Sequence, residues 1–239
     1  MKFELKDLSA EVACKFKQDF LSKRDIVEEY LAATKFTKAF TGAIQVKVWE
    51  YMPPISEALL PAWEGQRGYM KFAALRAKEG NAAIVHELIH VNAPNQSRFL
   101  AEGYAVYVEE KIGNIGAYPT FGNSIEDQMR KIGNSALQSV KLTDFDRVPT
   151  KRGTNLGKSA GLETEIPDLA QRGEYTYLVS GSFVKFLVET HGLENFKTLY
   201  ELTPLTPGVA TVADPDRYEN VFGKPLTALQ TQWLYWLEK

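Results

Sequence analysis

The sequence predicts a mixed α+β protein, mostly helical, with a small sheet that precedes a helix carrying two histidines. Apolar residues recur at helical spacing over much of the 239-residue chain. Residues 44–49 instead alternate apolar and polar side chains, as a half-buried strand does, and residues 68–72 give a second strand. Soon after comes the apolar run Ile84–Val91, which has no glycine or proline to interrupt a helix.

The composition is that of an ordinary globular protein. Hydrophobic residues make up 44% of the chain, and the net charge of −2 predicts no nucleic-acid or polyanion binding. No apolar run has membrane-spanning length. The sole cysteine, Cys14, excludes an internal disulfide, and we expect it to be buried or half-buried on a helix. No signal peptide precedes Lys2, which fits a cytosolic protein and equally an exported one that has lost its signal.

The organisation expected is one domain over residues 1–239, with residues 1–40 as a helical N-terminal extension packed on it. Ser9 is a plausible N-cap for a helix that reaches about Phe40, with Val12, Phe16 and Phe20 forming one apolar stripe. A length of 239 residues is enough to bury a sizeable core.

The segment His86-Glu87-Leu88-Ile89-His90 reads H-E-x-x-H. Four residues of helix place His86 and His90 one turn apart on the same face, where both imidazoles can reach one Zn²⁺ ion. Glu87 lies about 100° round the helix and can face a water at the open position of the metal as a general base. Two unrelated helix histidines are the alternative, but two of the three histidines in the chain fall in this motif.

Zinc needs a third protein ligand, and a second helical pattern over residues 98–110 offers Glu102. Gly103 would let this helix approach the first closely. A first-turn glutamate that only complements the helix dipole is the alternative. Glu109 and Glu110 are further candidates, but they lie about two turns, on the order of 10 Å, further along the helix.

H-E-L-I-H followed by Leu-Ala-Glu-Gly-Tyr-Ala resembles the gluzincin zinc metallopeptidases, specifically the peptidase-MA-like group. The resemblance covers about residues 44–192 and implies a zincin-like domain with His86, His90 and Glu102 as ligands and Glu87 as catalytic base. The sequence departs from the pattern in two ways: the interval from His90 to Glu102 is short, and Val106 stands where related enzymes place an acid four residues after the glutamate ligand.

The strand at residues 68–72 is expected to be a sheet edge that binds extended substrate by main-chain hydrogen bonds. Aminopeptidases of the group carry an acid there that holds the free amine of the substrate, whereas this chain has Lys71. A cation would repel an α-ammonium group, which favours an endopeptidase. The alternative is that Lys71 only protects an exposed edge from association.

The C-terminal half is expected to contain an amphipathic helix around residues 124–132, a long loop from Pro149 to Gly173, and a helix from Tyr175 to Thr190 that stops at Gly192. The resemblance implies that Tyr177, six residues before a phenylalanine, donates a hydrogen bond to the oxyanion of the reaction; packing is the alternative, and Tyr175 is a substitute donor. His191 is interpreted as structural, at a helix C-terminus that favours positive charge.

The function expected is hydrolysis of peptide bonds by a zinc-activated water, with a peptide or protein as substrate. Two alternatives stay open. One is a non-catalytic binding scaffold in which zinc only holds two helices together, although structural zinc sites are usually closed by four protein ligands. The other is a latent peptidase whose site is covered by the loop at residues 149–173 or by a partner.

Overall fold

The computed structural model describes residues 1–36, 42–50, 55–59, 68–132, 134–151, 156–159, 162–212 and 214–239. It is mixed α/β and mostly helical, with one four-stranded sheet in the described part of the chain, which confirms the fold class at this level. The chain forms two compact units: residues 1–94 with 108–122 make the first, and residues 95–107 with 123–239 make the second. The prediction of a single zincin-like domain stays a prediction.

The first unit contains the sheet, whose strands lie in the order β1-β2-β4-β3. Strands β1, β2 and β4 are parallel, and β3 pairs antiparallel with β4. The bounds are β1 Lys2–Leu5, β2 Ile44–Trp49, β3 Glu57–Leu59 and β4 Gly68–Ala73. The two predicted strands are confirmed, but the expectation that residues 68–72 form an edge is wrong, because β4 pairs on both sides.

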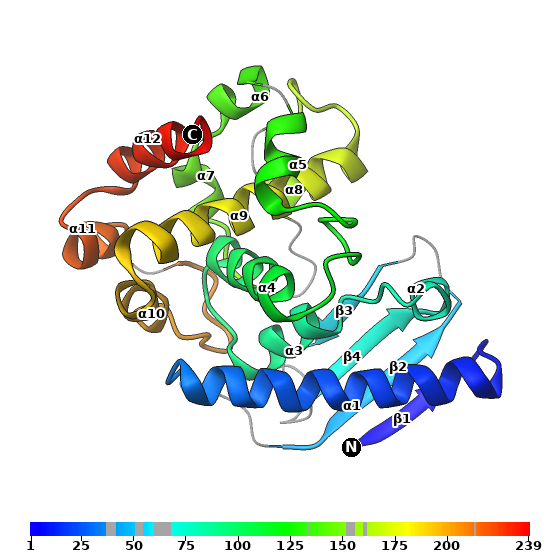
Figure 1. Cartoon of the computed structure of the whole chain (residues 1–239). Coiled ribbons are helices and arrows are strands. Elements are labelled where there is room, and N and C mark those ends of the chain that lie inside the picture. The colour runs from blue at the N-terminus through cyan, green and yellow to red at the C-terminus, as the bar shows by residue number, and fades with distance from the viewer. Residues whose placement is uncertain are drawn as a thin grey trace. The chain divides into compact units, whose positions relative to one another are not determined.

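Helix α1, Ala10–Ala33, crosses one face of this sheet (Figure 1). The hydroxyl of Ser9 accepts a hydrogen bond from the Val12 N–H at 3.3 Å, so the predicted N-cap is confirmed. Rings of α1 pack on β4, with the centroid of Phe72 5.5 Å from Phe16 and 6.2 Å from Phe20. The helix ends before Phe40, and residues 37–41 lie outside the described residues.

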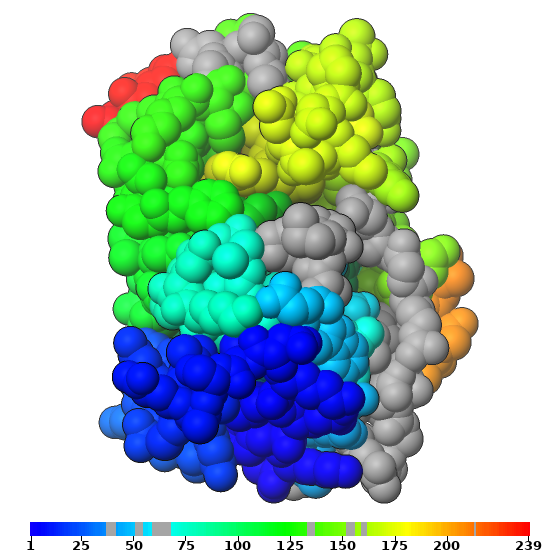
Figure 2. All heavy atoms as spheres, turned by 90° about the vertical axis from the view of Figure 1, so that its right-hand side faces the viewer, coloured from blue at the N-terminus to red at the C-terminus, as the bar shows by residue number. Residues whose placement is uncertain are grey.

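Two expectations concern the outer surface. Cys14 is exposed on α1, so the prediction of a buried or half-buried cysteine is wrong. Helix α1 needs only its sheet-facing side to be apolar, and Figure 2 shows β1 and α1 (dark blue) at the surface. Within the described ranges, no helix has the length and apolar character needed to cross a membrane.

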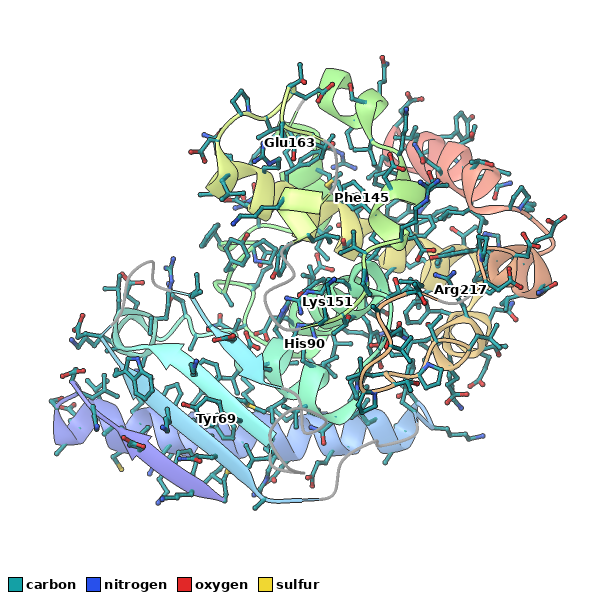
Figure 3. The ribbon with its side chains drawn as sticks, turned by 180° about the vertical axis from the view of Figure 1, so that it is seen from behind. Tyr69, His90, Phe145, Lys151, Glu163 and Arg217 are labelled. Carbon is teal, nitrogen blue, oxygen red and sulfur yellow. The ribbon has the colours of Figure 1, made fainter. Side chains whose placement is uncertain are left out.

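The face of the sheet away from α1 carries a row of charges across all four strands. Glu4, Lys47, Lys71 and Glu57 stand in register, and Tyr69 lies on the same face (Figure 3). Lys47 lies 3.6 Å from the Glu4 carboxylate, and Lys71 donates a hydrogen bond to Glu57 at 3.2 Å. Both ammonium groups also stand over the Tyr69 ring, at 5.2 and 5.6 Å from its centroid. Lys71, on the central strand β4, is therefore paired with Glu57 on the neighbouring strand β3.

Three helices follow β4 and lead to the candidate site. Their bounds are α2 Ala74–Glu79, α3 Ile84–Asn92 and α4 Arg98–Ile112. Helix α3 is buried along its whole length, which explains why its sequence is apolar on every side except for its histidines, Glu87 and Asn92. Helix α4 contributes residues 98–107 to the second unit and residues 108–112 to the first. The predicted helices around both motifs are confirmed.

The rest of the second unit is helical. The bounds are α5 Ile125–Lys131, α6 Asn134–Ser139, α7 Leu142–Asp146, α8 Leu156–Ser159, α9 Leu169–His191, α10 Leu193–Glu201, α11 Arg217–Phe222 and α12 Leu226–Leu237. The predicted stop at Gly192, which has φ 88°, is confirmed. The predicted loop over residues 149–173 is wrong in part, because it contains α8 and the start of α9.

Glycine lets α4 and α9 pack backbone to backbone. A Cβ atom on Gly103 would stand 2.5 Å from the carbonyl oxygen of Ser180 and 2.6 Å from Cγ2 of Val184. On α9, a Cβ atom on Gly181 would stand 2.9 Å from Cβ of Val106. The close approach expected from Gly103 exists, but its partner is α9, which fixes the segment of α4 that carries Glu102.

Candidate metal centre

The two motif histidines face one another on α3. His86 is 5% exposed and His90 is 8% exposed. Their Nε2 atoms lie 3.0 Å apart, and the ring centroids are 4.6 Å apart with the planes at 82°. The four-residue spacing therefore places both imidazoles on the same face of α3 with their Nε2 atoms side by side, as predicted. His90 is labelled in Figure 3.

This separation suits a shared ion. Two imidazole nitrogens bound at about 2.0–2.1 Å to a tetrahedral Zn²⁺ lie about 3.3 Å apart, close to the distance between the Nε2 atoms of His86 and His90. Without an ion, two neutral imidazoles at this distance satisfy at most one hydrogen bond between their facing nitrogens. The geometry therefore fits a ligand pair as well as it fits a simple contact.

Glu102 is the residue that joins the histidines. Its side chain is completely buried on α4. His86, His90 and Glu102 each offer one ligand atom, and these atoms all lie within 4.8 Å of one another, so the three could hold a metal ion. Two imidazoles and a carboxylate are a donor set that zinc takes in catalytic sites, where the fourth position stays open. The three residues could therefore hold a metal ion, and zinc stays a prediction.

Comparison of the whole chain adds no relative to this geometry. No family model, curated protein or solved structure matches it. The resemblance to gluzincins consequently stays an expectation that depends on the two helical motifs alone, and any function has to be argued from the site itself.

Arg98 is a neighbour of the site that the sequence reading missed. Its Nη2 lies 2.5 Å from Oε1 of Glu102, one helical turn away on α4. Arg98 is partly exposed, whereas Glu102 is fully buried, so the guanidinium brings positive charge to a carboxylate that water does not reach. The i,i+4 spacing of an arginine and a glutamate was a readable signal for this pair.

Tyr200 also reports on the surroundings of Glu102. Burial raises the pKa of the Tyr200 phenol, and the nearby Glu102 carboxylate raises it further. The ring of Tyr200 lies 5.2 Å from that of Tyr104 on α4. An aromatic, largely dry environment therefore surrounds the carboxylate within the second unit.

The start of α4 is held by a buried polar network in the second unit. The hydroxyl of Ser97 accepts a hydrogen bond from the Leu100 N–H at 3.3 Å and donates one to Asp146 at 3.1 Å. Asp146 also accepts hydrogen bonds from Arg217 at 2.5 Å and from the Tyr218 hydroxyl at 2.9 Å. Because every member is buried and bonded, the network fixes the helix end from which Glu102 projects.

The sequence predicts catalytic roles for three further side chains, which the structure describes but does not test. Glu87 is 4% exposed and follows His86 directly on α3. Tyr177 lies half-buried on α9, and its role as an oxyanion donor stays a prediction. Tyr175 is buried, and its hydroxyl has no hydrogen-bond partner among the residues that the structure describes. Burial raises the pKa of this phenol, so it remains a neutral donor at physiological pH.

His191, the third histidine, takes no part in this group. Its ring packs against Phe186 and Phe222, at centroid distances of 5.6 and 5.2 Å. Burial lowers the pKa of His191, and Lys224 lowers it further. The structural interpretation agrees with this packing. The expected positive charge at the helix end does not, because both effects favour the neutral ring.

Proposed function

We propose that this protein is a zinc-dependent peptidase with His86, His90 and Glu102 as metal ligands and Glu87 as general base. The observation that carries the proposal is the buried group of two imidazoles and one carboxylate, beside a glutamate one residue after the first ligand. A purely structural zinc site would call for a fourth protein ligand, and the sole cysteine is exposed on α1.

When bound, Zn²⁺ supplies a Lewis acid that polarises the scissile carbonyl and acidifies a water molecule. Glu87 accepts a proton from the attacking water and then gives it to the leaving amine. Glu102 and the imidazoles hold the metal, and Arg98 keeps the Glu102 carboxylate oriented through their 2.5 Å ion pair. Tyr177 is the proposed donor to the oxyanion, with Tyr175 as the alternative.

An extended peptide is the proposed substrate, and β3 is the strand on which it would lie. Strand β3 ends the sheet order and lies beside α3 within the first unit. A segment added there would form main-chain hydrogen bonds. Glu57, the acidic residue on β3, already accepts a hydrogen bond from Lys71. Its carboxylate is therefore already paired with a cation and is not set up to hold the free amine of a substrate. This pairing favours an endopeptidase over an aminopeptidase.

The test is Glu87→Gln, which keeps the volume of the side chain and removes the base. We expect the variant to fold and bind zinc normally while it loses at least about 10²-fold in turnover of a mixed peptide library. Zinc content, melting temperature and turnover are measured on the same preparations, and peptides with blocked amino termini should be cleaved no worse than free ones.

Unaltered turnover in Glu87→Gln would refute the mechanism, whatever the metal content. Glu110→Gln, a half-buried glutamate on α4, is the matched control and should keep wild-type turnover. A zinc-binding wild-type protein that cleaves no peptide would favour the binding scaffold or the latent peptidase.

A further inference from the structure

Glu109 is a buried carboxylate that the proposed mechanism does not use. It lies on α4 and is 3% exposed. Its Oε2 accepts a hydrogen bond from the backbone N–H of His86 at 2.6 Å, and its Oε1 accepts one from the Asn114 N–H at 2.7 Å. All three residues belong to the first unit. Glu109 is thus attached to the backbone of a proposed ligand rather than to its imidazole.

Helix α3 lacks a cap of its own. Ala83 stands at the N-cap position, and no side chain there accepts a hydrogen bond from the first turn. The first N–H groups of a helix have no partner within the helix, and a buried one is costly unless another group accepts it. His86 is the third residue of α3, so Glu109 satisfies one of these groups from another helix. A negative charge also suits the positive end of the helix dipole.

The surroundings are shaped for this carboxylate. Burial raises the pKa of Glu109, and the hydrogen bonds from the backbone N–H groups of Asn114 and His86 lower it. Lys23, which donates a hydrogen bond to the carbonyl of Gly113 at 3.1 Å, contributes a nearby positive charge. A Cβ atom on Gly113 would stand 2.6 Å from the carboxyl carbon, so glycine leaves the space that the carboxylate occupies.

Glu102 and Glu109 are seven residues apart, so they lie on nearly the same face of α4, two turns from each other. Glu102 joins the candidate ligands, while Glu109 binds the backbone of α3 at His86. One helix face therefore offers a ligand to the metal and an anchor to the helix that carries the other two ligands.

We propose that Glu109 is a positioning residue of the metal centre, which fixes the backbone of His86 and thereby the direction of its imidazole. This inference rests on the metal site of the proposed function but not on peptide hydrolysis. Groups that orient a ligand from outside the coordination sphere typically change metal affinity about 10–100-fold when removed. A merely structural carboxylate would change stability and leave the affinity of the folded protein alone.

The experiment compares Glu109→Gln with Val46→Ala, a fully buried residue of β2 in the same unit, on a strand that carries none of the candidate ligands. Zn²⁺ affinity is measured by competition with a chelator, and the absorption spectrum of the Co²⁺-loaded protein reports ligand geometry. We expect Glu109→Gln to bind Zn²⁺ about tenfold or more weakly, with an altered Co²⁺ spectrum. Val46→Ala should retain both properties.

Wild-type Zn²⁺ affinity in Glu109→Gln, or an equal loss in Val46→Ala, would overturn the inference. Should Glu109→Gln fail to fold, Gly113→Ala gives a second test, because the added methyl group would meet the Glu109 carboxyl group at 2.4–2.6 Å and the backbone carbonyl oxygen of Glu109 at 2.6 Å. Wild-type affinity there overturns the inference equally. Amide exchange at His86 in the metal-free protein must also be faster in the folded variant.

The outcomes separate this inference from the proposed function. If the wild-type protein binds Zn²⁺ but cleaves no peptide, the proposed peptidase activity is refuted and the role of Glu109 is not. If the wild-type protein cleaves peptides and its Glu109→Gln variant binds Zn²⁺ normally, only the role of Glu109 is refuted. Absence of Zn²⁺ binding by the wild-type protein overturns both.

Discussion

At the scale of single residues, burial decides what the ionisable groups can do. His86, His90 and Glu102 are all buried, which makes them expensive to leave without a metal or hydrogen bonds. His191 shows the other case: the ring packs between two aromatic side chains, and its Nε2 has no hydrogen-bond partner among the described residues. The same residue type therefore serves as a candidate ligand at one place and as a packing group at another.

The lowered pKa of His191 predicts a pH dependence of stability. A histidine whose pKa is lower in the folded than in the unfolded chain binds its proton more readily when unfolded, so the stability present above the ordinary pKa of about 6.5 is lost as the pH falls below it. His191→Phe keeps the ring contacts and removes the titration. Urea unfolding at pH 7 and pH 5 should show a smaller loss of stability for the variant. An identical loss of stability in both proteins would show that His191 is not the source of this pH dependence.

At the scale of elements, the packing of α4 on α9 positions Glu102. Helix α4 carries Gly103 immediately after this candidate ligand, and a Cβ atom on Gly103 would stand 2.5 Å from the Ser180 carbonyl oxygen, closer than such atoms can come. On α9, the obstacle beside Gly181 is instead the side chain of Val106. A backbone carbonyl within a helix cannot move as a side chain can, so the two glycines differ in how strictly they are required.

Gly103→Ala should therefore destabilise the protein by about 1–3 kcal/mol, although alanine is the better helix former. Gly181→Ala should also destabilise it, and part of this loss should be recovered when Val106→Ala removes Cγ1, which would stand 2.4 Å from the new methyl group, while Cβ of Val106 remains at 2.9 Å. Chemical denaturation of the single and double variants measures both effects. A Gly103→Ala variant as stable as the wild-type protein, or a Gly181→Ala variant that Val106→Ala does not relieve, would contradict this account of the helix packing.

At the scale of the whole molecule, the candidate metal centre would draw its ligands from two helices. His86 and His90 lie on α3, and Glu102 lies on α4. An unfolded chain does not hold these groups together, so an ion that binds all three stabilises the folded protein only. Metal binding and folding should consequently be linked.

Removal of the metal should lower the melting temperature. At a free ion concentration a thousand times Kd, the stabilisation is about 4 kcal/mol. Elemental analysis should find about one zinc per chain in the wild-type protein. The double variant His86→Ala, His90→Ala should contain none, and a chelator should not change its melting temperature. Full zinc content in that variant would show that the ion binds elsewhere.

The sequence alone determined the features that local spacing controls. The four-residue interval between His86 and His90 sets both rings on one helical face, and alternation over residues 44–49 predicts a strand. The Ser9 cap and the stop at Gly192 also follow from local chemistry. Each of these depends on residues within a few positions of one another, so their physics can be read directly from the chain.

Only the tertiary structure decided what each acid on α4 does. Glu102 and Glu109 share a helix face, so periodicity cannot say which joins the histidines and which binds the backbone of α3; distances to residues far away in sequence make that choice. The position of β4 inside the sheet was hidden for the same reason, because β1 and β3 are too short to show a period. Pairing and packing between distant segments follow from burial of the whole chain, which local spacing does not encode.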